Sequence, residues 1–240
     1  MKYEIGKIFK SKHCGEFEIL RKIGYRKFSI RFVNTGYITE TDLKEVRTGE
    51  IKDRSLPLVY GIGIIGKKYP SKIDGKVVFS YSLWKDILRR VTSDQSYKKC
   101  GISDNFKAYE YFHEWCLDTS NSNREGWEID KDLFSGKMKI YSEDTCVFLP
   151  SKINNFLVKT DADGLPIVNI ISKGGFYYAS VLTLEGIPII SKAYTLYDDA
   201  LKFYFDIKCQ QIRLLAKKYK GELDAKTYDA LINYRSRFIV

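Results

Sequence analysis

The spacing of apolar residues changes along this chain, and that change sets the fold class. Residues 16–20 and 27–33 alternate polar and apolar side chains, which is typical of strands with one buried face. Residues 83–91 and 106–116 instead carry apolar side chains every three or four positions, which predicts helices. Strands followed by helices, rather than a regular alternation of the two, indicate an α+β chain.

The C-terminal third repeats this order. Three short apolar segments, at about 166–171, 176–183 and 187–193, are separated by turn residues and predict three strands. A long helical pattern follows from about 197 to 219, and a terminal helix is expected at about 225–234. We therefore expect a three-stranded sheet backed by one long helix at this end.

Glycine, proline and lysine dominate residues 57–76, which predicts a linker or an extended loop. Glycines at 61, 63 and 66 match a phosphate-binding spacing, but the Lys-Lys-Tyr-Pro that follows does not begin the helix such a cradle needs. The predicted organisation has three modules. They are a small β-rich domain at 1–58, an α/β domain at 59–158, and a sheet-plus-helix domain at 159–240.

The chain is basic, with 40 Lys and Arg against 30 Asp and Glu and a formal net charge of +10. Such an excess favours an anionic partner, of which nucleic acid is the most common. A merely soluble basic protein is the alternative, and charge alone does not decide between the two. The sequence contains no apolar run of membrane-spanning length, and residues 1–6 lack the apolar core of a signal peptide. We therefore expect a cytoplasmic protein without a membrane partner.

Five cysteines are widely spaced, and no two form a Cys-x-x-Cys pair. An odd, scattered set argues against a disulfide framework and favours reduced thiols. Zinc held by Cys100, His113, Cys116 and Cys146 is an alternative, because His113 and Cys116 would share a helical face. Buried free thiols are the favoured interpretation.

Residues 164–181, followed by Asp198-Asp199-Ala200 at the start of a long helix, resemble the Apetala-type DNA-binding domain of plant transcription factors and phage nucleases. The resemblance implies a three-stranded sheet that enters the major groove of double-stranded DNA. This chain lacks the arginine- and tryptophan-rich strands of the plant members. The resemblance implies DNA contacts from exposed strand residues, namely Asn169, Ser172, Lys173, Tyr177 and Lys192.

Residues 129–132, 141–146 and the Asn154-Asn155 pair resemble the phage-type HNH, or ββα-metal, endonucleases. The resemblance implies Asp130 as one metal ligand, Asn154 or Asn155 as another, and Mg²⁺ or Mn²⁺ as the metal. Lys131 stands where the family has its general-base histidine. Asp132 is the alternative base, and Lys131 could instead stabilise the charge on the phosphate. Arg89 and Arg90, at the end of the preceding helix, are predicted to be available to a DNA phosphate.

Three functions follow from these patterns. The first is a phage-type HNH-like DNA endonuclease, weakened or inactive because Lys131 replaces histidine; a missing general base costs about 10²–10⁴-fold in rate. The second is a non-catalytic DNA-binding or regulatory phage protein, for example one that counters host proteins. A third is an adaptor whose basic faces meet an acidic protein.

Overall fold

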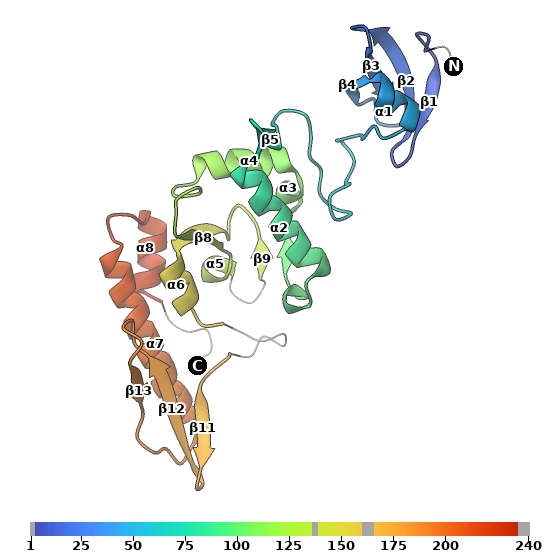
Figure 1. The fold of residues 1–240 in the computed structure, drawn as a ribbon. Helices are drawn as coiled ribbons and strands as arrows, with labels where there is room; N and C mark the ends of the chain where they lie inside the picture. The colour runs from blue at the N-terminus through green and yellow to red at the C-terminus, as the bar shows by residue number, and fades with distance from the viewer. Residues whose placement is uncertain (1–2, 136–138, 160–165, 235–240) are drawn as a thin grey trace. The chain divides into compact units, whose positions relative to one another are not determined.

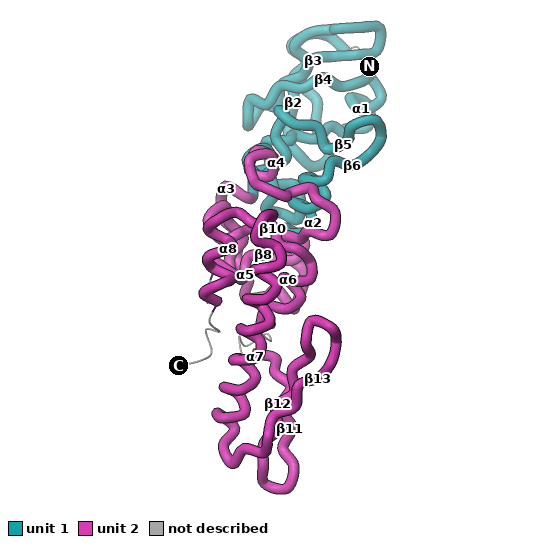
Figure 2. The backbone as a smooth tube through the Cα atoms, turned by 90° about the vertical axis from the view of Figure 1, so that its left-hand side faces the viewer, with its two compact units in different colours: residues 1–88, 107–113 teal, residues 89–106, 114–240 magenta. Residues whose placement is uncertain are grey.

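The computed structural model describes residues 3–135, 139–159 and 166–234, and its fold is α+β, as the apolar spacing predicts (Figure 1). The chain divides into two compact units (Figure 2). Unit 1 contains residues 1–88 and 107–113, and unit 2 contains the rest. In the described residues, no helix is both long and apolar enough to cross a membrane.

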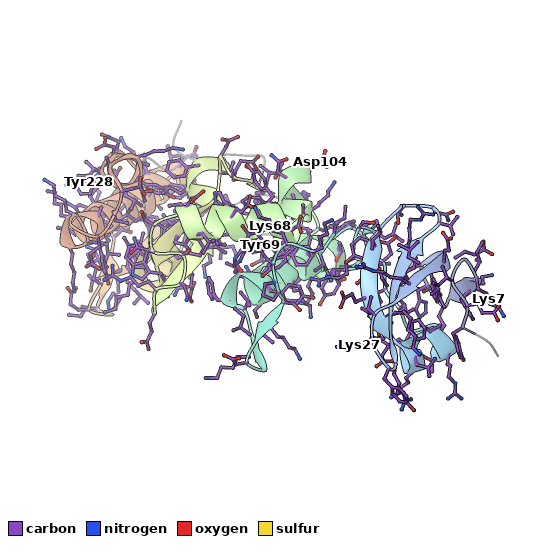
Figure 3. All side chains as sticks on the ribbon, turned by 90° about the horizontal axis from the view of Figure 1, so that it is seen from above. Lys7, Lys27, Lys68, Tyr69, Asp104 and Tyr228 are labelled. Atoms are coloured by element: carbon purple, nitrogen blue, oxygen red, sulfur yellow. The ribbon has the colours of Figure 1, made fainter. Side chains whose placement is uncertain are left out.

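Unit 1 begins with an antiparallel sheet in the order β1-β2-β3-β4. Its strands are β1 (Ile8–Ser11), β2 (Gly15–Lys22), β3 (Lys27–Phe32) and β4 (Ile38–Asp42), and α1 (Leu43–Thr48) follows directly. The alternation that predicts β2 and β3 places one set of side chains in a common core, because residues two apart share a face of a strand. Prominent among these core residues are Phe17, Ile19, Phe28, Ile30, Phe32 and Val46. Lys7 and Lys27 are labelled at this sheet in Figure 3.

Two helices end the first half of the chain. The helix α2 (Phe79–Ser93) buries Trp84, Ile87 and Leu88, and α4 (Tyr109–Asp118) begins with the buried Tyr109. The rings of Trp84 and Tyr109 lie 5.5 Å apart, so the predicted apolar stripes do form a core. A small hairpin, β5 (Lys72–Ile73) with β6 (Lys76–Val77), comes before α2.

The segment 57–76 is tied to these helices. The backbone N–H of Ile64 donates to Lys107 O at 2.9 Å. Gly63 lies so close to α2 that an added Cβ would be 2.3 Å from Leu88 Cδ1 and 2.8 Å from the Trp84 ring. The segment is mostly loop, and Gly63 permits part of its backbone to pack closely on α2. Its role as a linker or an extended loop between modules stays a prediction.

Ser80, near the start of α2, is of a residue type that often caps helices. Ser80 Oγ lies 2.6 Å from His113 Nδ1, inside the helix rather than before it, so it does not cap the first turn. The His113 ring packs 4.3 Å from the ring of Tyr69, which follows Lys68 on the tied segment (Figure 3). A serine hydroxyl that bonds to a side chain of another helix is turned away from the backbone N–H groups of its own first turn.

Unit 2 contains short elements that bring distant segments together. After η1 (Gln95–Tyr97), the strand β7 (Gly101–Ile102) pairs in parallel with β9 (Ile140–Tyr141). The helix α3 (Asp104–Lys107) lies between β7 and α4, so the helical pattern at 106–116 is divided. Two-residue strands have no alternation to detect, so the sequence gives no signal for this pairing.

The middle of unit 2 holds two antiparallel strands followed by a helix. The strands are β8 (Trp127–Asp130) and β10 (Val147–Pro150), and α6 (Ser151–Phe156) follows β10 directly. The short helix α5 (Asp132–Ser135) follows β8. Ser151 does not cap α6 although its residue type favours caps, because its hydroxyl donates to Gly126 O at 2.9 Å and the helix has no side-chain cap.

The C-terminal part is an antiparallel sheet backed by a long helix, as the sequence predicts (Figure 1). The strands are β11 (Ile170–Lys173), β12 (Phe176–Leu182) and β13 (Pro188–Ile190), and β12 packs against α7 (Tyr197–Lys218). The last helix is α8 (Ala225–Ile232).

The helix α7 contributes to two separate cores. Its first half buries Ala200 and Phe205 against the sheet. Its second half buries Ile212 and Leu215 together with β10, α6 and α8. The sheet and the two-strand-plus-helix segment therefore share one supporting helix.

Candidate functional site

The two strands β8 and β10 with α6 form the scaffold of the predicted catalytic centre. Asp130, the last residue of β8, pairs with Val147, and α6 packs against both strands. Leu149 and Ile153 are fully buried in the core beneath. This order of strand, strand and helix is the one that the HNH resemblance implies, and Asp130 lies at the end of its first strand.

Asp130 is buried, with 5% of its surface exposed. Its Oδ1 accepts the backbone N–H of Leu133 at 2.8 Å, so the carboxyl group caps the first turn of α5. Burial raises the pKa of Asp130 to about 6, and the negative charge of Asp132 adds to the increase. Asp130 thus has a structural role in holding the turn after β8.

Lys131 is also buried, and its ammonium group has a partner. Its Nζ donates to Asp132 Oδ2 at 2.9 Å. Burial lowers the pKa of Lys131, but the charge and hydrogen bond of Asp132 outweigh it, so the pKa lies above its ordinary value. The side chain therefore carries a positive charge at neutral pH. That state does not suit the role of general base, which requires a neutral amine.

Two tyrosine rings enclose the same ammonium group. Lys131 Nζ lies 5.2 Å from the centre of the Tyr141 ring and 5.6 Å from that of Tyr97. Arg90 contacts the same two tyrosines. Its Nη1 donates to the Tyr141 hydroxyl oxygen at 3.4 Å, and its guanidinium lies 5.4 Å from the centre of the Tyr97 ring. We call these residues with Asp132 the Lys131 cluster: Arg90, Tyr97, Lys131, Asp132 and Tyr141.

Burial raises the pKa of Tyr141 to about 12, so its hydroxyl is neutral. Sequence reasoning missed Tyr97 and the role of Tyr141, because neither position has a pattern that connects it to Lys131. Within the described residues, Asp132 Oδ1 is buried without a hydrogen-bond partner. One oxygen of this carboxylate is thus neutralised by Lys131, and the other is not.

The other predicted metal ligands have different surroundings. The Asn154 amide donates to Glu128 Oε2 at 2.8 Å, and Asn155 is exposed. Throughout residues 3–135, 139–159 and 166–234, no group of three or more His, Cys, Asp or Glu side chains is placed to hold a metal ion. Because Asp130 caps a turn and Asn154 bonds to Glu128, the residues as arranged do not fit the predicted Mg²⁺ or Mn²⁺ site.

Arg89 and Arg90 have different surroundings. Arg89 is exposed and forms an ion pair with Asp94 at 3.5 Å, whereas Arg90 is half-buried in the Lys131 cluster. Of the two predicted phosphate contacts, Arg90 therefore has the stronger structural role.

The cysteines of the alternative zinc site are free thiols. Cys116 and Cys146 are buried, and burial raises the pKa of each thiol to about 12. Burial also raises the pKa of Cys100, while His113 bonds to Ser80 in the other unit.

Strand register decides how the predicted DNA-facing residues are oriented. Ala179 and Val181 are buried against α7, so alternation places Tyr177 on the same side. The Tyr177 ring packs edge-on against Tyr197 at 5.6 Å, and Ser172 is its partner in register. Tyr177 and Ser172 therefore lie on the helix side of the sheet, which corrects the expectation that both are on its free face.

Ser172 is nevertheless exposed, and so are the other three predicted residues. Lys173 pairs with Phe176 on the side opposite Ala179, and Asn169 comes just before β11. Lys192 follows β13, and its ammonium group lies 5.4 Å from the Tyr194 ring. Register thus places Lys173 on the free face of the sheet, and Asn169 and Lys192 are exposed next to the ends of β11 and β13.

A pocket of about 260 Å³ lies elsewhere in unit 2. Among the described residues, its lining includes Asp118, Glu143 and Asp224 and a single cation, Lys226. The Lys226 ammonium lies 4.6 Å from the Phe134 ring. An acidic lining repels phosphate, so this pocket is not where a nucleic-acid backbone would bind.

Comparisons with known proteins give no relative. No family model matches the chain. No curated protein and no solved structure matches it either.

Proposed function

We propose that this chain binds duplex DNA and that the free face of the β11–β13 sheet makes the contact. The observation that carries the proposal is the sheet itself, which is backed on one side by α7 and exposed on the other. Its three strands contain no acidic residue, and Lys173 and Lys192 flank them. A rigid face without negative charge is suited to approach a polyanion.

The charge of the whole chain supports the same partner. A net charge of +10 attracts DNA at long range, and exposed lysines can neutralise individual phosphates. Each neutralised phosphate releases bound cations, so binding should weaken steeply as salt rises, with a slope of about −0.9 per phosphate in a plot of log K against log salt.

The test is fluorescence anisotropy of a labelled duplex titrated with the full chain at several salt concentrations. The double change Lys173→Ala/Lys192→Ala should reduce both the affinity and the salt slope, the slope by about 0.9 for each phosphate that is no longer neutralised. Its matched control is Lys202→Ala/Lys218→Ala, which removes two exposed lysines of α7. Absence of binding at low salt would refute the proposal, and equal effects of the two double variants would refute the sheet as the DNA-binding surface.

Metal-dependent DNA cleavage is the second candidate function. The specific observation in its favour is the β8–β10–α6 order with Asp130 at the end of the first strand. The arrangement of Lys131, Asp130 and Asn154 does not fit a metal, as described above, so we derive no catalytic step from it. DNA binding without cleavage is therefore the better-supported function.

Supercoiled plasmid separates the two candidates. We expect the full chain to leave it intact with Mg²⁺ or Mn²⁺ between about pH 6 and 9, where an ordinary carboxylate is ionised. Nicking that needs the metal and disappears in Asp130→Ala would instead establish the endonuclease.

A further inference from the structure

The free face of the C-terminal sheet is mainly apolar, which lysine–phosphate contacts do not explain. In the register of the sheet, Ile171 lies beside Tyr178, and Ser180 lies beside Ile190. Ile171 is 60% exposed and Ile190 is 66% exposed. Phe176 and Leu182, on the same face of β12, are 42% and 58% exposed. An exposed apolar patch of this kind usually marks a binding surface.

The partner must supply apolar groups and negative charge together. Lys173 lies at the end of β11, next to Phe176, and Lys192 follows β13 two residues after Ile190. A second copy of this chain is a poorer partner. Its own face would place the same lysines opposite these lysines, and the three strands contain no acidic residue to pair with them. The major groove of DNA offers both features, because the thymine methyl is its one apolar group and phosphates line its edges.

The shape of the sheet agrees with this partner. The turn between β11 and β12 is Gly174-Gly175, with φ of +60° and +81°, and a Cβ added at either glycine would meet no atom within 4 Å. The hairpin therefore ends without side chains. Ile171 and Ile190 lie on the outer strands β11 and β13. These strands are two spacings of about 4.8 Å apart, and that distance is smaller than the roughly 12 Å width of the major groove.

We infer that this face recognises thymine methyl groups, with Ile171 and Ile190 as the main contacts and Phe176 and Leu182 beside them. The inference rests on the proposed DNA binding and adds a base preference to it. Aliphatic contact with the methyl discriminates thymine from every unmethylated base. The lysines hold the sheet in the groove without regard to sequence.

The experiment compares a short A·T-rich duplex made with thymine and the same duplex made with uracil, titrated with the full chain. Uracil removes the methyl and leaves the base pairing intact. We expect about a fourfold loss of affinity for each methyl that the protein buries. A G·C duplex with 5-methylcytosine should bind more tightly than one with cytosine, since the methyl occupies the same position in the groove.

Two variants locate the effect. Ile171→Ser/Ile190→Ser should remove the difference between thymine and uracil duplexes while the salt slope stays unchanged. Its control is Leu214→Ser on α7, a side chain of similar exposure at 50%, which should keep the difference. All three positions are solvent-exposed, so neither variant removes a core residue.

The failures are distinguishable. If the chain binds neither duplex, the proposed function fails and the inference with it. If it binds thymine and uracil duplexes equally, DNA binding stands and methyl recognition is overturned. A dimer seen by sedimentation that Ile171→Ser/Ile190→Ser dissociates, together with equal binding of both duplexes, would assign the face to self-association.

Discussion

Lys131 lies where the HNH pattern has its general-base histidine. Its surroundings show why the lysine cannot take the same role. A histidine at this position could be neutral near pH 7. The lysine is instead paired with Asp132 and enclosed by Tyr97 and Tyr141. The sequence could identify the Asp-Lys-Asp turn from its pattern. It could not identify the tyrosines, because contacts across the fold leave no local signal.

The pair of Lys131 and Asp132 should show energetic coupling. Lys131→Met or Asp132→Asn alone should each lower the free energy of unfolding by about 2 kcal/mol, below the roughly 3–5 kcal/mol of a fully buried pair because Asp132 is partly exposed. The double variant should lose clearly less than the sum. Urea denaturation of the four proteins measures this cycle, and strictly additive losses would show that the pair is not coupled.

Asp130 should give the protein a stability that depends on pH. Its pKa is raised from 3.8 to about 6, so the folded chain binds this proton more tightly than the unfolded chain does. The stabilising effect of the proton is full below about pH 4 and is lost as the pH rises through about 6.

The matched variant is Asp130→Asn, which stays neutral and can still accept the Leu133 N–H. Relative to wild type, it should gain ~3 kcal/mol of unfolding free energy between pH 4 and pH 7. Denaturant titrations of both proteins at each pH give this difference, in which other titrating groups cancel. An equal difference at both pH values would contradict the burial of Asp130.

At the scale of elements, apolar spacing locates the long helices well, but residue type does not identify the side chains that cap helices. The pattern at 197–219 corresponds to α7, whose buried side chains recur at helical spacing along both of the cores that it joins. Ser80 and Ser151 are plausible caps by residue type, yet their hydroxyls bond to His113 and Gly126. Which partner a serine takes depends on tertiary packing that the local sequence does not contain.

Gly63 shows how a segment interpreted as a linker becomes part of a core. Gly63→Ala should destabilise unit 1 by about 1–3 kcal/mol, because the new methyl overlaps Leu88 and Trp84. Gly221→Ala is the control, since Gly221 has open space and an ordinary backbone conformation. Thermal denaturation compares the two, and equal midpoints would mean that the segment does not pack against α2.

At the scale of the molecule, the predicted boundary at residue 158 falls inside a shared core. Leu149 and Ile153 pack with Ile212 and Leu215 of α7, and all four belong to unit 2. The division into three modules stays a prediction. Composition shifts marked the possible boundaries, but they carry no information on which modules share apolar side chains.

Two fragments test that division. The fragment 89–240 keeps this core and the pairing of β7 with β9, so it should unfold in one cooperative transition. The fragment 159–240 loses the partners of Ile212 and Leu215, so it should be markedly less helical and less stable. Circular dichroism during heating measures both. Equal cooperativity in the shorter fragment would support the three-module division.

The helix that serves two cores also limits how this chain can change in length. Each residue added to a helix turns everything beyond it by about 100°. One alanine inserted in α7 between Phe205 and Ile212 would rotate one apolar stripe away from its core while the other stayed in place. Seven added residues would restore the phase to within about 20°. Insertions and deletions in α7 should therefore be tolerated only when their length is close to a whole number of helical turns. Natural variants of this chain should differ in the length of their loops but keep the spacing between the two apolar stripes of α7.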